Sequence, residues 1–279
     1  MPESMLVKAK DAVSVHRTIR YYSADGIDLI QIDKKSFEEK RNKKSESDEL
    51  DVLLNSIDIS LDDIEGSTVS KSATGTFDNG TVAVSMDIYT VSGGQQGQFW
   101  AVCTYDWSDM PDSNYTDYVG ISRDEKSSVL PNSAGGFWVY KYTKYSLYAG
   151  VGGVSVMNST NYTESDNVSF SELEVNEGAA YIMSVPMPPD YWPGSMVQGT
   201  FAIGYLPTDG YGAVEYDGIP AYPNQTSNIN HWGTYTHQYK TLYFWENISF
   251  SYPLGVSFTV NPESKFKKIV DESLWTYRP

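Results

Sequence analysis

The densest group of residues that could bind a metal ion lies between Tyr105 and Gly120. Ca²⁺ takes about six to eight oxygen ligands, which carboxylates and side-chain amides supply. Five side chains in this segment carry such oxygens: Asp106, Asp109, Asp112, Asn114 and Asp117. Their spacing lacks the central glycine and final glutamate of the helix–loop–helix calcium motif. Aspartate, asparagine, serine and proline are also the common residues of turns, so a plain structured turn is the alternative to a calcium site.

Two pairs of aromatic residues could bind a glycan. Tyr191 with Trp192, and Trp232 with Tyr235, would each offer a flat platform for a sugar ring. Aromatic side chains near loops also serve as packing anchors, so the same residues fit a structural role. A glycosidase would need two carboxylates about 5 to 10 Å apart, and a chain with 36 acidic residues offers too many pairs to single one out. The sequence therefore names candidate ligand-binding residues and no catalytic pair.

Histidine and cysteine, the usual residues of transition-metal and nucleophilic sites, are scarce. The histidines are His16, His231 and His237, and the one cysteine is Cys103. If residues 231–244 form one strand, His231 and His237 lie on one face roughly 20 Å apart, at about 3.3 Å per residue, which is too far for one metal ion. Cys103 falls in an alternating apolar segment and is predicted to be a small core residue. We therefore expect no catalytic residue, and no cofactor other than calcium.

The overall composition limits the partners. The net charge of −16 repels phosphate backbones, so the sequence predicts no nucleic-acid partner. The longest apolar runs fall short of the roughly 18 residues that a membrane-spanning helix needs, which predicts no transmembrane segment. A single cysteine excludes a disulfide within the chain. In a host that glycosylates asparagine, seven sequons would mark exposed surface. They begin at Asn79, Asn114, Asn158, Asn161, Asn167, Asn224 and Asn247.

Most of the chain alternates polar and apolar residues with the period of two that β-strands show. Residues 12–33 are predicted to form a hairpin, because Asp25-Gly26 joins two alternating segments. Asp78-Asn79-Gly80 predicts a second hairpin, between residues 69–77 and 81–92. The later segments predicted as strands are 99–107, 137–147, 151–157, 168–175, 179–185, 199–206, 234–244, 248–252 and 256–260. Many short strands and few helical patterns predict an all-β fold, an antiparallel β-sandwich or jelly roll.

The N-terminal part differs in composition from the rest. Residues 34–49 are almost all charged or polar and predict a solvated helix or a linker. Residues 50–65 fit a short amphipathic helix that passes into a strand near Ile57. We therefore expect an extension over residues 1–65, made of the hairpin and the charged helix or linker, followed by a β-sandwich domain over residues 66–279. Residues 186–198 and 217–230 are expected to be irregular loops.

One stretch resembles a known group of proteins. Residues 105–120 contain Tyr105-x-Trp107, then Pro111, then Asp117 and Gly120, which Ile121 follows. This pattern resembles a motif of uncharacterised exported β-rich proteins of Gram-positive bacteria. The sequence His-Trp-Gly-Thr-Tyr-Thr-His at residues 231–237 is similar to a second element of those proteins. The resemblance implies export and a β fold, and it implies no activity.

The leading hypothesis is a secreted or surface-associated β-sandwich that acts by binding an unknown protein or glycan ligand. It depends on the strand pattern, the 22 tyrosines and 7 tryptophans, and the acidic charge. Three alternatives stay open: a structural subunit of a virion or filament, a carbohydrate-active enzyme, and a β pore-forming toxin. The last is motivated by long alternating strands rich in serine and threonine. An extracellular or cell-surface location would require a removed signal peptide, because residues 1–10 are charged.

Overall fold

Strands dominate the computed structural model, which describes residues 3–25, 28–43, 50, 53–55, 57–60, 80–109, 116–168, 178–184, 193, 195–240, 247–251, 255–259 and 265–279. The helices and strands are α1 (Glu3–Asp11), β1 (Ala12–Asp25), β2 (Asp28–Ile32), α2 (Lys34–Lys43), β3 (Asp58–Ser60), β4 (Thr81–Val91), β5 (Phe99–Asp109), β6 (Thr116–Arg123), β7 (Ser127–Val129), β8 (Gly135–Gly150), β9 (Gly153–Val168), β10 (Gly178–Ser184), β11 (Ser195–Val197), β12 (Phe201–Pro220), β13 (Ser227–Lys240), β14 (Asn247–Ser251), β15 (Gly255–Thr259) and β16 (Lys265–Tyr277). This content confirms the predicted all-β fold.

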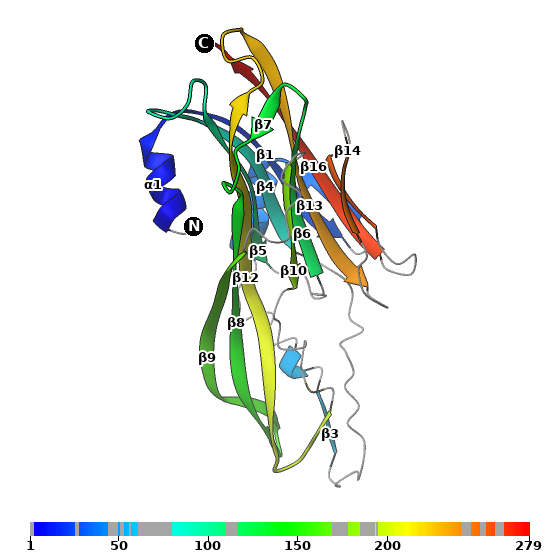
Figure 1. Ribbon diagram of the computed structural model, residues 1–279. Coiled ribbons are helices and arrows are strands. Elements are labelled where there is room, and N and C mark those ends of the chain that lie inside the picture. The colour runs from blue at the N-terminus through cyan, green and yellow to red at the C-terminus, as the bar shows by residue number, and fades with distance from the viewer. Residues whose placement is uncertain are drawn as a thin grey trace.

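Two antiparallel sheets face each other (Figure 1). The large sheet has the strand order β2-β1-β4-β5-β12-β8-β9, and β7 also pairs with β12. The small sheet has the order β10-β6-β13-β16. Two further pairs complete the described strands, the antiparallel β14–β15 hairpin and the parallel pair β3–β11. Consecutive strands pair at β1–β2, β4–β5 and β8–β9, whereas the pairs of the small sheet join strands that are distant in the chain.

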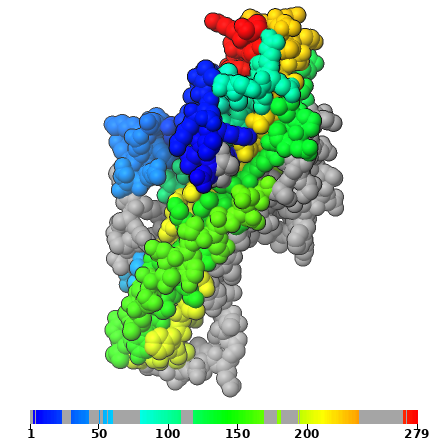
Figure 2. All heavy atoms as spheres, turned by 60° about the vertical axis from the view of Figure 1, so that its left-hand side comes forward, coloured from blue at the N-terminus to red at the C-terminus, as the bar shows by residue number. Residues whose placement is uncertain are grey.

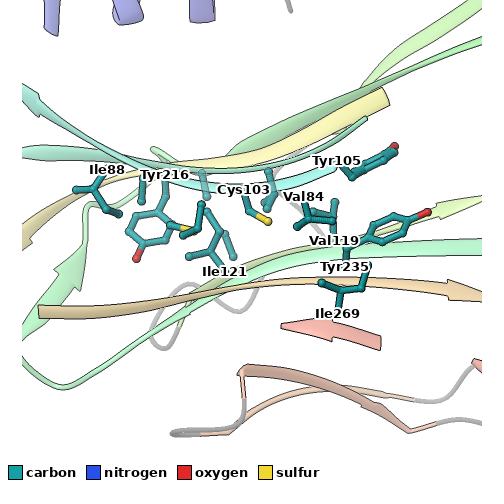
Figure 3. Packing of buried hydrophobic residues seen from close by; sticks show 14 of the residues in the cluster. Val84, Ile88, Cys103, Tyr105, Val119, Ile121, Tyr216, Tyr235 and Ile269 are labelled. Carbon is teal, nitrogen blue, oxygen red and sulfur yellow. The ribbon is translucent and has the colours of Figure 1, made fainter. Parts of the chain in front are cut away.

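The main hydrophobic core fills the space between the two sheets (Figure 3). Successive residues of a strand point to opposite faces, so every second residue of β4 and β5 enters this core. Val84 and Cys103 of the large sheet meet Ile121 and Tyr235 of the small sheet there. Gly233 allows the close approach, because a Cβ at this position would lie 2.8 Å from the Cys103 Sγ atom. The core position predicted for Cys103 is confirmed, since its side chain is fully buried.

The N-terminal hairpin belongs to the large sheet. The β1 strand pairs with β4 from Ala12 to Ser23 and with β2 up to the pair of Asp25 with Asp28. Gly26 of the predicted turn lies outside the described residues. The expected division between residues 65 and 66 therefore crosses a continuous sheet. The α2 helix begins within the charged segment and is anchored by Phe37, whose ring centroid lies 4.8 Å from that of Tyr21.

The α1 helix was not predicted from the charged residues 3–11. It covers the outer face of the large sheet, where Met5 is buried in a cluster with Trp100 and Phe137. The ammonium group of Lys8 lies 3.3 Å from an Asp217 carboxylate oxygen and above the Trp100 ring. The apolar residues Met5 and Ala9 are four residues apart, which is the spacing of one helix face.

Several strands are longer than the sequence pattern suggests. The strand predicted at 151–157 is part of a longer strand, β9, which follows a turn at residues 151–152 and runs to Val168. Of the strand predicted at 168–175, residues 169–175 lie outside the described residues. The loop expected at 217–230 is shorter, because β12 runs to Pro220 and β13 begins at Ser227. The β16 strand was not predicted. Among the described residues, no helix has the length and hydropathy that a bilayer-crossing segment needs.

Candidate functional site

The candidate site lies at the far end of a three-stranded ribbon that extends below the sandwich (Figure 1). The ribbon is the distal part of β8, β9 and β12, and we define its tip as residues 145–157 and 201–206. Across the ribbon, Tyr148 of β8 is the register partner of Phe201 on β12 and of Ser155 on β9. The hairpin closes where Gly150 pairs with Gly153, whose φ of 128° falls in a region that favours glycine.

The ribbon buries opposite faces along its length. Near the sandwich, Tyr140 and Tyr142 point into the main core. Beyond Thr143, the buried residues are instead Tyr145, Leu147 and Ala149, which point to the other face. The cover on that face is a second apolar cluster that includes Ile57, Met196 and Leu206. The face that carries Tyr148 and Phe201 has no such cover among the described residues.

Apolar side chains are exposed on the uncovered face and at the hairpin turn. Val151 is 94% exposed, Phe201 is 70% exposed and Met157 is 59% exposed. Ile203 is also exposed, and the Tyr148 and Phe201 rings lie side by side with centroids 5.0 Å apart. Figure 2 shows these parts of β8, β9 and β12, in green and yellow, at the lower end of the molecule. Single exposed apolar residues are ordinary, but a group at one end marks an interaction surface.

The tip also lacks charge. Residues 145–163 and 195–208 contain no aspartate, glutamate, lysine, arginine or histidine, although one residue in five of the chain is charged. The backbone register brings these two segments together. Asp58 of β3 is the register partner of Ser195, and β3 follows Ile57 of the cluster that covers the other face. The tip is therefore an uncharged, partly apolar end on a protein of net charge −16.

A second candidate is a polar pocket of about 340 Å³ between α2 and the outer face of β1, β4 and β5. Arg17 donates two hydrogen bonds to the Asp87 carboxylate, at 2.9 and 2.8 Å. The predicted calcium ligand Asp106 faces this pocket, and burial raises the pKa of its carboxyl group. Lys34, Arg41 and Glu38 complete a balanced set of charges. The described pocket residues include no histidine or cysteine, and Arg17 is already paired with Asp87. We therefore interpret the pocket as polar side chains that pack beneath α2.

The other predicted calcium ligands are not brought together by the described structure. Asp109 ends β5 and Asp117 lies in β6, and the structure describes neither side chain. Asp112 and Asn114 lie outside the described residues. The described part of the chain contains no group of three or more histidine, cysteine, aspartate or glutamate side chains that could hold a metal ion.

The predicted aromatic platforms fall in two different places. Tyr191 and Trp192 lie outside the described residues. Trp232 and Tyr235 are buried in β13, a central strand of the small sheet. Tyr235 stacks on Tyr105 with ring centroids 4.8 Å apart, and its hydroxyl accepts a 2.6 Å hydrogen bond from Trp107 Nε1. These two residues take the packing role that the sequence left as the alternative.

The ribbon tip was missed at the level of the sequence. Its signal was present as two charge-free segments, 145–163 and 195–208. Each segment alone resembles an ordinary polar or buried strand. Only the pairing of β8 with β12, across about fifty residues of chain, shows that they form one surface.

Comparison with known proteins gives no family. No protein-family model matches the chain, and no curated protein matches it. Among solved structures, the Clostridium perfringens NetB toxin in its membrane-inserted form is similar at 5% sequence identity and a TM-score of 0.27, covering 70% of this chain and 91% of the toxin. The Clostridium perfringens delta-toxin is similar at 9% identity and a TM-score of 0.24, covering 70% and 84%. At these scores the likeness extends to the β-rich character of the chains.

Proposed function

We propose that this protein is exported and acts by binding, and that it attaches through the ribbon tip to an uncharged, zwitterionic lipid surface. The observation that carries the proposal is the group of exposed apolar side chains on the tip, residues 145–157 and 201–206, which contains no charged residue. Transfer of a valine, isoleucine, methionine or phenylalanine side chain out of water is worth about 1.5 to 3 kcal/mol. The tip side chains together would contribute on the order of 5 kcal/mol to the free energy of binding. This is less than the sum of full transfer values, because most of these side chains are already partly buried.

Charge supports the choice of a zwitterionic surface. A net charge of −16 repels an anionic membrane, and the repulsion is strongest where the carboxylates lie. The uncharged tip is the part that can approach a lipid headgroup region without moving a charge out of water. Tyr148, beside Phe201, adds an amphipathic ring of the kind found where protein meets the membrane interface.

Shape supports a lipid target over a folded one. A small ligand binds in a concave pocket, whereas the tip is the narrow end of an extended ribbon (Figure 1). A stable protein–protein interface buries about 800 Å² on each partner, which requires a broader complementary face. A lipid surface needs no complementary shape, because lipids rearrange around the side chains that enter.

Flotation with lipid vesicles tests the proposal. We expect the protein to float with phosphatidylcholine vesicles and to float less well when anionic phosphatidylserine is added. Phe201→Asp should weaken binding by roughly thirty-fold or more, since losing about 2 kcal/mol of apolar transfer corresponds to that factor. The matched control is Tyr222→Asp, which places the same charge on an exposed aromatic position in the turn after β12.

The result that would contradict the proposal is equal flotation of the wild type, Phe201→Asp and Tyr222→Asp. A wild-type protein that stays unbound at every lipid concentration would contradict it as well. The same vesicles, loaded with a fluorescent dye, separate attachment from the pore-forming alternative. Binding without dye release supports attachment alone, whereas release that depends on Phe201 supports a pore-forming activity.

A further inference from the structure

The β9 strand leaves one long edge of the large sheet open. It has 16 residues and pairs with β8, and no other described strand pairs with it. At about 3.4 Å per residue it offers roughly 50 Å of backbone whose outward N–H and C=O groups lack a strand partner. In Figure 1 it forms the outer border of the ribbon, with no labelled element beyond it.

The other sheet edges carry features that discourage pairing with a second chain. The β2 edge has five residues and the β10 edge has seven. Residues 12–20 of β1, which β2 does not cover, carry the charged residues Arg17 and Arg20. The β16 edge begins with Lys265, Lys267 and Lys268. Short length and lysine residues are the devices by which natural sheets protect their edges. The β9 strand has neither, and it contains no arginine or proline. Its one irregularity is a bulge at Met157, and Asn158–Val168 then follow β8 in unbroken register.

The surroundings of β9 favour a second copy of this chain over a foreign strand. Domains that add a foreign strand recognise it through side-chain pockets beside the edge. Side chains on both faces of β9 are mostly exposed, so the described residues form no such pocket beside it. A second copy needs none, because a two-fold axis aligns the same small polar side chains with one another.

The charge pattern selects an antiparallel arrangement. The β9 strand is uncharged from Gly153 to Thr163 and carries Glu164 and Asp166 near its end. Parallel pairing would place the acidic residues of the two copies together. An antiparallel pair with its axis near Asn161 places Glu164 opposite the Asn158 of the other copy. We propose that β9 pairs antiparallel with the β9 of a second copy, which continues the large sheet across a two-fold axis.

Two opposing electrostatic effects set the conditions for this dimer. Each copy carries a net charge of −16, which repels the other copy. At physiological ionic strength this repulsion is screened beyond about 8 Å. The backbone hydrogen bonds across the edge act at short range, so added salt weakens them much less. We therefore expect the dimer to strengthen as salt is added. The inference does not depend on the proposed lipid binding, because it is tested without lipid.

Sedimentation across a range of protein concentrations tests the dimer, with protein from a host that adds no N-glycans. We expect a monomer–dimer equilibrium for the wild type. Ser159→Lys with Ser165→Lys, two exposed positions on β9, should weaken it by roughly ten-fold or more, the effect of an edge penalty of about 1.4 kcal/mol. The control is Ser92→Lys with Thr226→Lys, which adds the same charge at exposed turn positions. Added lysines reduce the net negative charge of each copy. If repulsion between the copies alone controlled association, both double-lysine variants would therefore dimerise more tightly than the wild type.

Single-cysteine substitutions locate the axis. In an antiparallel pair only the residue at the axis faces its own copy, with Cα atoms about 4.5 to 5.5 Å apart, which a disulfide can bridge. We expect mild oxidation to cross-link one position between Asn158 and Glu164 far more than its neighbours, while the buried Cys103 does not react. A monomer at all concentrations, or a dimer that keeps its affinity in the Ser159→Lys/Ser165→Lys variant, would overturn the inference. So would equal cross-linking at every position.

Discussion

The buried histidine His231 should make the protein less stable in mild acid. Its side chain is fully buried in the main core, with its ring 5.1 Å from that of Phe99 and 6.2 Å from that of Tyr216. Among the described residues, neither ring nitrogen has a hydrogen-bond partner. Burial, helped by the positive charge of Arg123 on the neighbouring strand, lowers the pKa of His231 from 6.5 to about 3.

The sign of the effect follows from which state binds the proton first. The unfolded chain takes up a proton at His231 near pH 6.5, whereas the folded protein takes it up only near pH 3. Stability from the neutral ring is therefore complete above pH 6.5 and is lost as the pH falls toward 3. The difference between the two pKa values gives a loss of about 2 kcal/mol at pH 5 and about 3 kcal/mol at pH 4.

Urea unfolding at pH 8, 6, 5 and 4 measures this loss. We compare the wild type with His231→Phe, which fits the aromatic surroundings and cannot titrate. The free energy of unfolding of the wild type, minus that of the variant, should fall by about 2 kcal/mol between pH 8 and pH 5. Burial raises the pKa of the Asp106 and Glu215 carboxyl groups, which titrate in both proteins, so their effect cancels in the difference.

Parallel stability curves for the wild type and His231→Phe would refute this reasoning, because the ring would then titrate alike in both states. An imidazole proton resonance assigned to His231 that titrates near pH 6 in the folded protein would refute it independently. That second measurement uses the wild type alone.

Three further predictions concern the packing of the sheets. Arg17→Met should lower the free energy of unfolding, measured by urea titration, because it leaves the buried Asp87 carboxylate without its cation. Solvent that reaches the Arg17 side limits this loss to about 2 kcal/mol. Gly233→Ala should cost about 1 to 3 kcal/mol, and adding Cys103→Ala should restore part of that loss, since the new Cβ would meet the cysteine sulfur. Met5→Asp should raise hydrogen exchange in residues 3–11 while the β4 and β5 amides keep their protection, because α1 lies outside the sandwich.

The strand pattern predicted most of the sandwich because one face of each strand is core. In β4, Val84 and Ile88 are fully buried on one face, and the alternation is visible without any tertiary information. The pairing of β1 with β2, which ends at Asp25 and Asp28, is equally local. The small sheet was harder, because both of its faces are covered. Trp232 and Tyr235 lie on opposite faces of β13 and both are buried, so the sequence alone did not separate packing from ligand binding.

Other features depend on contacts that are distant in the chain. The α1 helix is held by the outer face of the large sheet, and its short apolar stripe was obscured by charged neighbours such as Lys8. The length of β9 was hidden because its serine, threonine and asparagine residues resemble a loop. Its pairing with β8 over residues 136–150 supplies the hydrogen bonds that hold it extended.

The change of buried face along β8 explains how a stable fold can present an apolar tip. If the ribbon buried one face throughout, the residues that follow Tyr140 and Tyr142 in the alternation, including Tyr148, would be covered. Moving the cover to the other face at Thr143 keeps the ribbon anchored through Leu147. Near its end the ribbon carries apolar residues on both faces, and the described residues cover one of those faces. Among the described residues the other face is uncovered, so substitutions at Phe201 should change the proposed attachment without lowering the stability of the sandwich.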